Sequence, residues 1–198
     1  STQARHSFPT RRSSDLKQQL QCFTAGHMAC PKDDKAILQF LYDFISSFRS
    51  ATHPFHSAAA IFQAPGDATE QAFDALMWQR LQAISDLDAE HFTYDKRVNA
   101  NASAPDFSFS LMEEAFFIIG LHPNSSRPAR RFSYPALIFN PHAQFEQLKA
   151  ANQYSKMKTI VRRRDTAYSG SVNPMLQDFG EASEAMQYSG MQYDRNWQ

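Results

Sequence analysis

Two histidines and a basic loop lie close together in the middle of the chain and could do chemistry. His122 ends one apolar stretch, and His142 follows a second apolar stretch and a proline. The loop between them contains two adjacent serines and three arginines: Ser125, Ser126, Arg127, Arg130 and Arg131. Imidazoles bind metals and move protons, and guanidinium groups bind carboxylates and phosphates. The combination predicts a site for an anionic ligand, a metal or a metallocofactor.

Each of these residues also has a structural interpretation. His122 could be a core histidine that bonds a main-chain carbonyl, and His142 a surface residue in a first helical turn. The arginines could form a solvated loop, although guanidinium groups so close together repel one another unless anions lie between them. Ser126 is a candidate nucleophile, but no Gly-x-Ser-x-Gly turn frames it. The residues alone leave ligand binding, metal binding, catalysis and a structural role open.

Composition excludes some classes of partner. The 198 residues contain 20 Lys and Arg against 20 Asp and Glu, so no overall field recruits nucleic acid. No apolar run approaches the 18 residues of a membrane helix, so we expect no membrane partner. The chain has neither a phosphate-binding Gly-x-x-x-x-Gly-Lys motif nor a Gly-x-Gly-x-x-Gly motif. Its two cysteines are too few for a disulfide scaffold, and we expect a cytoplasmic location.

The sequence of the N-terminal residues indicates an origin different from that of the rest of the chain. Residues 6–16 read HSFPTRRSSDL, which resembles a translated sequencing adapter. We therefore expect residues 1–16 to be an artefact or a disordered tail, and residues 17–198 to form the domain.

Two segments have the periodicity of amphipathic helices. Apolar side chains recur at intervals of three and four residues over 37–48 and again over 73–87. Asp33 is expected to cap the first helix. Asp67 is expected to cap the second, with Glu70 completing a capping box three residues later.

The central part of the chain predicts a sheet. Strands are expected, from period-two alternation or continuous apolar runs, at residues 107–111, 115–121 and 135–139. Residues 112–114 are expected to form a hairpin turn between the first two. A helix is expected over 140–150, with helical character continuing to Arg164, whereas residues 17–32 are expected to be irregular. The predicted helices and the predicted antiparallel strands occupy separate parts of the chain, which favours a single α+β domain with an antiparallel sheet packed with several helices.

Long ungapped motifs, dense from residue 107 onward, carry a resemblance to a known family. The matching segments are residues 107–110, 120–127, 129–132, 139–146, 162–165, 170–176, 178–181, 183–185 and 187–190. Through them the chain, over about residues 36–197, resembles the YqcI/YcgG family. That family includes the haem-dependent N-hydroxylase of guanitoxin biosynthesis. Relatives continue beyond the position of Gln198 and differ around residues 22–31, so we expect the domain to be truncated at both ends.

The resemblance implies a haem protein that activates O2 and hydroxylates a guanidine or amine nitrogen of a small amino-acid-like substrate. An external electron donor, either a reductant or a redox partner protein, would be needed. We expect His122 to be the axial iron ligand, with His142 as the second choice or as a distal catalytic group beside Ser126. Arg127, Arg130 and Arg131 would hold the haem propionates.

Two other functions remain open. The first is a binding module, without redox chemistry, for a small anionic metabolite. The second is a non-haem metal hydrolase, which requires a third ligand, expected to be a carboxylate, near both His122 and His142. The oligomeric state is open as well, and a homodimer is compatible with the sequence.

Overall fold

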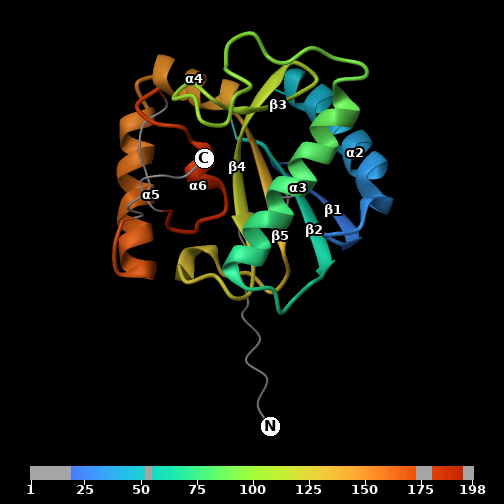
Figure 1. Cartoon of the computed structure of the whole chain (residues 1–198). Coiled ribbons are helices and arrows are strands. Elements are labelled where there is room, and N and C mark those ends of the chain that lie inside the picture. The colour runs from blue at the N-terminus through green and yellow to red at the C-terminus, as the bar shows by residue number, and fades with distance from the viewer. Residues whose placement is uncertain (1–18, 52–54, 173–179, 194–198) are drawn as a thin grey trace.

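A five-stranded mixed sheet forms the centre of the protein, in the computed structural model that describes residues 19–51, 55–172 and 180–193 (Figure 1). The strand order is β1-β2-β5-β4-β3. The strands are β1 (Leu20–His27), β2 (Ser57–Ala64), β3 (Phe109–Leu111), β4 (Glu114–Leu121) and β5 (Ala136–Pro141). The longer helices are α2 (Asp34–Arg49), α3 (Glu70–Asp88), α4 (His142–Ala150) and α5 (Tyr154–Ser169). A single turn, α6 (Ala185–Tyr188), lies near the end of the described chain.

Most of the sheet is antiparallel, as expected, but its first pair is parallel. β2 pairs with β5, β5 with β4, and β4 with β3 in antiparallel fashion, whereas β1 runs parallel to β2. Parallel neighbours need a long crossover connection, and α2 supplies it. The α+β class is confirmed.

Helices cover both faces of the sheet, and alternate residues of β4 face the two layers. Phe116 points toward α2, where its ring lies 6.5 Å from that of Phe44. Phe117 and Ile119 point to the other face, which α4 and α5 cover (Figure 1). The register of β4 and β5 places Asn140 opposite Phe117, so both residues reach the same face of the sheet.

The predictions for the centre of the chain are confirmed. The three predicted strands correspond to β3, β4 and β5, and the 140–150 segment to α4, whose first residue is His142. Met112 and Glu113 have φ values of 49° and 58°, as the tight turn of a hairpin requires. Helices α2 and α3 also lie where the periodicity placed them.

Three details at the start of the chain were predicted wrongly. Residues 17–32 are not irregular, because they contain β1, a partly exposed edge strand that reaches the core through Phe23 and Ala25. Thr69, not Asp67, caps α3, since its hydroxyl accepts the Ala72 N–H at 3.1 Å. Asp33 occupies the N-cap position of α2, as predicted, but the side-chain capping bond is absent, because its carboxylate accepts the Gly26 N–H at 2.7 Å instead.

The adapter-like segment, residues 1–16, lies outside the described residues. None of the helices in the described ranges is long and apolar enough to cross a membrane.

Close packing across β4 generates a first prediction. A Cβ on Gly120 would lie 2.8 Å from a ring carbon of Phe73 and 3.0 Å from the Tyr188 carbonyl oxygen. Gly120→Ala is therefore expected to lower the free energy of unfolding by about 1–3 kcal/mol in urea titrations. Gly66→Ala is the control, because no heavy atom lies within 4 Å of its added Cβ. Equal effects of the two substitutions would contradict this packing.

Candidate functional site

Two adjoining cavities lie between the sheet and the α4–α5 layer. The first, here called the His142 cavity, has a volume of about 340 Å³. The second, here called the arginine trough, has a volume of about 820 Å³ and is bordered by the basic loop that follows β4. Both share the walls formed by Phe117, Ile119, Val161 and Arg162. The two cavities are therefore neighbours that share one wall. Together they are called the hollow here, with an imidazole at one end and guanidinium groups at the other.

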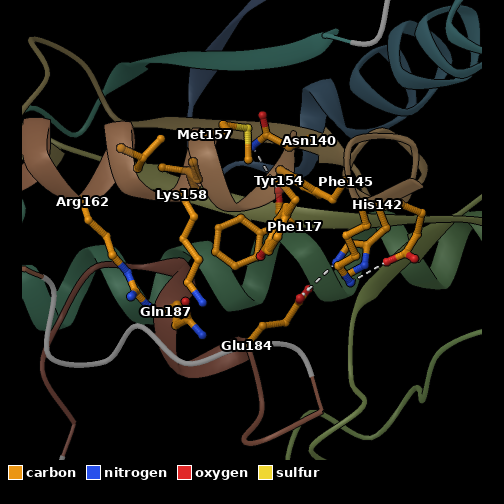
Figure 2. Close-up of a pocket in the computed structure, with 14 residues that line it drawn as sticks. Phe117, Asn140, His142, Phe145, Tyr154, Met157, Lys158, Arg162, Glu184 and Gln187 are labelled. Carbon is orange, nitrogen blue, oxygen red and sulfur yellow. Dashed lines mark hydrogen bonds and ion pairs between the residues drawn. The ribbon is translucent and has the colours of Figure 1, made fainter. Parts of the chain in front are cut away.

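A buried carboxylate holds His142 at the wall of its cavity. Glu184, only 4% exposed, precedes α6, and its Oε2 lies 3.0 Å from His142 Nε2 (Figure 2). Its Oε1 accepts the Ser108 hydroxyl at 2.8 Å and the Tyr188 phenol at 2.6 Å. Burial, together with the nearby Glu184 charge, raises the pKa of Tyr188 well above its usual range, so the phenol stays a proton donor.

This network decides which proton His142 carries. A carboxylate only accepts hydrogen bonds, so His142 must donate its Nε2 proton to Glu184. A carboxylate behind a histidine fixes the orientation and tautomer of the ring. Tyr188 in turn accepts the Phe109 N–H at 3.1 Å, so the network is anchored in β3. The imidazole thus stands in one orientation at the edge of a largely apolar cavity.

Arg130 joins the loop to the part of the β4 edge that does not pair with β3. Its guanidinium donates to the carbonyl oxygens of Gly120, Gln187 and Tyr188 at 2.9–3.3 Å. Desolvation by burial, with the charge of Arg127 beside it, lowers its pKa to about 10. Arg130 remains charged at neutral pH, and most of its donors are used to attach α6 to the sheet.

The other two arginines of the loop also have protein partners. Arg127 forms an ion pair with Asp165 of α5 and donates to the Ser171 carbonyl at 2.7 Å. Arg131 donates to the Ser125 carbonyl oxygen at 2.7 Å. Asp165 therefore offsets part of the repulsion expected among the three guanidinium groups, and the charge of Arg127 still acts on Arg130. All three still border the arginine trough.

The serines of the loop bind Glu70 at the start of α3. Glu70 Oε1 accepts the main-chain N–H of Ser126 at 3.1 Å and its hydroxyl at 3.0 Å. Ser125 Oγ lies 3.4 Å from the same oxygen. Ser126 thus holds the loop against α3, and it does not border either cavity. Glu70 is thus the first residue of α3 and binds the loop, whereas Thr69 before it caps the helix.

His122 lies on the opposite face of the sheet from the cavities. It is fully buried, and its ring stacks on Phe73 of α3 with 4.4 Å between centroids. Neither ring nitrogen has a hydrogen-bond partner among the described residues. Burial lowers the pKa of His122, and the Glu70 carboxylate opposes that shift only in part. The residue is therefore a neutral imidazole in the core.

The structure brings together only some of the predicted residues. His142 borders the first cavity of the hollow, and Arg127, Arg130 and Arg131 border the second, whereas His122 and Ser126 border neither. The described residues contain no group of three or more His, Cys, Asp and Glu side chains that could hold a metal ion. The described residues therefore do not form a hydrolase site that uses both histidines, because the sheet lies between His122 and His142.

Sequence reasoning missed Glu184 as the partner of His142, and Tyr188 and Ser108 as its neighbours. The four-residue spacing of Glu184 and Tyr188 puts them on one face of a turn, which is the only local signal. Their contact with His142 spans 42 residues and depends on how α6 packs beside β4.

Comparison with known proteins identifies relatives but no activity. The sequence pattern of the YqcI/YcgG family matches residues 5–198. The chain is 26% identical over 177 residues to the "Uncharacterized protein YqcI" of Bacillus subtilis (strain 168), an alignment that covers 86% of this chain and 68% of that protein. No solved structure matches significantly.

The buried state of His122 predicts a pH dependence of stability. Its pKa is lowered on folding, so below pH about 6.5 the unfolded chain binds a proton that the folded chain does not. Stability is therefore retained above that pH and lost as the pH falls, by at most about 1.4 kcal/mol per pH unit. In urea titrations between pH 7.5 and 5.5, His122→Phe should weaken this dependence.

The exposed His91 provides the matched control. His91→Ala should keep the pH dependence of the unsubstituted protein. The same slope in all three proteins would show that His122 does not carry the effect.

Proposed function

The chain belongs to the YqcI/YcgG family, and we propose that it is a haem-dependent oxygenase that hydroxylates a guanidine or amine nitrogen of a small amino-acid-like substrate. The observation that carries the proposal is the His142 imidazole, oriented by buried Glu184, at the wall of a largely apolar hollow. The proposal includes an external electron donor and a cytoplasmic location.

The residues around the hollow fit the chemical requirements of haem. A neutral histidine is a common axial ligand of haem iron, and His142 is the histidine that borders the hollow. Phe117, Ile119 and Val161 supply an apolar wall between the His142 cavity and the arginine trough. The cationic side chains of the trough suit the two propionates. When bound, haem would supply the iron that activates O2 with electrons from the external donor.

The preference between the two histidines therefore shifts from His122 to His142. In the proposal, His142 would hold the iron and Glu184 would keep the ring and its tautomer in place. His122 would serve the packing of the core, where Phe73 covers its ring. Ser126, which is bound to Glu70, would position the loop rather than react.

The protein's own contribution would be orientation and exclusion of water. Asn140 donates to the Phe117 carbonyl at 3.2 Å and accepts the Ser57 hydroxyl at 2.7 Å, which fixes the floor of the cavity beneath α4. A rigid apolar floor would hold a small substrate close to His142 and keep bulk water out.

The alternative remains a binding module for a small anionic metabolite, without redox chemistry. The observation that favours it is an excess of positive charge, since the walls of the two cavities carry seven Lys and Arg side chains against three Asp and Glu. Anion binding by protein that takes up no haem would distinguish this function from the first.

An absorption spectrum of protein produced with a haem supply tests the proposal. We expect a Soret band that His142→Ala abolishes or shifts, because the ligand to the iron is lost. His91→Ala, which removes an exposed histidine, should leave the band unchanged. His122→Phe should leave it unchanged as well, provided that the variant folds. Absence of a Soret band, or a band insensitive to His142→Ala, would defeat the proposal.

A further inference from the structure

Helix α5 presents one continuous stripe of side chains to the His142 cavity. The stripe consists of Tyr154, Met157, Lys158, Val161 and Arg162. This spacing of three and four residues defines a single helical face. No residue of α5 is fully buried, although that face is turned toward the sheet. The helix therefore borders an open space instead of packing into a closed core.

Arg162 has an unsatisfied donor on this face. Its Nε atom is buried and has no hydrogen-bond partner among the described residues. A buried donor without an acceptor is unfavourable, and the Arg162 side chain borders both cavities, so an acceptor that a ligand brings to this guanidinium group would be favoured. The three arginines of the loop differ from Arg162, because each of them donates to main-chain carbonyls.

Lys158 and Gln187 bring further polar groups to the same end of the cavity. Lys158 lies one helical turn before Arg162, and Figure 2 shows both side chains extending toward Gln187 of α6. In the same view His142 lies on the other side of Phe117, and Glu184 lies below Phe117 and points toward His142. The cavity thus has a cationic end and an imidazole–carboxylate end with an aromatic ring between them.

We propose that Arg162 and Lys158 form a carboxylate-binding subsite in the His142 cavity. This inference deepens the proposed function and rests on it for the reaction, although not for binding. A guanidinium group and an ammonium group one turn apart can both donate to one carboxylate, and such charge-assisted bonds are strong. The carboxylate could come from a small substrate or from a haem propionate, which share this chemistry.

The dimensions of the cavity limit a small-molecule ligand. A volume of about 340 Å³ lies at the lower end of the range for ligand sites, roughly 300–1,000 Å³. The two polar ends suit a molecule of amino-acid size with an anionic group at Arg162 and a cationic nitrogen near Glu184. L-arginine has both groups, and agmatine has the same guanidine without the carboxylate, so the two form a matched pair of probes.

Calorimetry on the haem-free full chain tests whether the subsite binds the carboxylate of a small-molecule substrate. If the carboxylate is that of a small molecule, L-arginine should bind at least about tenfold more tightly than agmatine, and Arg162→Gln should remove that difference. Lys158→Gln should reduce it. Arg163→Gln is the matched control, because Arg163 is exposed, borders neither cavity and loses the same charge.

Titration with haem and with haem dimethyl ester tests whether the subsite binds a haem propionate. Weaker binding of haem, but not of the ester, to Arg162→Gln than to Arg163→Gln would assign the subsite to a propionate. The subsite is overturned if Arg162→Gln and Arg163→Gln bind L-arginine and haem equally, or if the unsubstituted protein binds neither. An Arg162-dependent preference for L-arginine in protein without a Soret band would support the subsite and refute the oxygenase.

Discussion

The buried carboxylate of Glu184 is the group on which the arrangement of the site depends. A charge that is 4% exposed is stable only if donors surround it, and Glu184 finds them on three separate segments: Ser108 before β3, Tyr188 in α6 and His142 in α4. These contacts bring the end of the chain against the sheet. They also give His142 a defined tautomer and orientation. Loss of the carboxylate would therefore disturb both the packing of α6 and the imidazole at the cavity wall.

The arginines of the basic loop mainly hold parts of the protein together, although they also border the arginine trough. Arg130 attaches α6 to the edge of β4, and Arg127 attaches the loop to α5 through Asp165. These contacts shape the arginine trough and use donors that would otherwise bind an anion. Arg162 differs, since its buried Nε has no partner among the described residues. The arginine that borders both cavities thus lies on α5, outside the loop that first suggested an anion site.

Local pattern was sufficient to predict much of the fold but little of the site. The periodicities of α2 and α3, the β3–β4 hairpin and the start of α4 at His142 are all encoded in neighbouring residues. β1 was not predicted because Phe23 and Ala25, its residues that reach the core, are too few to give a clear alternating pattern. β2 was not predicted because its alanines have weak strand preference. The placement of His122 and His142 on opposite faces depends on sheet register. The His142–Glu184 contact depends on packing between distant segments, which no local pattern encodes.

The most direct test of the central claim is ring ¹⁵N NMR of histidine-labelled protein during haem titration. The ring of His142 should carry its proton on Nε2 in the free protein, because Glu184 accepts it. Bound haem should shift or broaden the His142 signals, while those of the exposed His27 and His91 stay in place. Unchanged His142 signals in protein that has demonstrably bound haem would contradict the account.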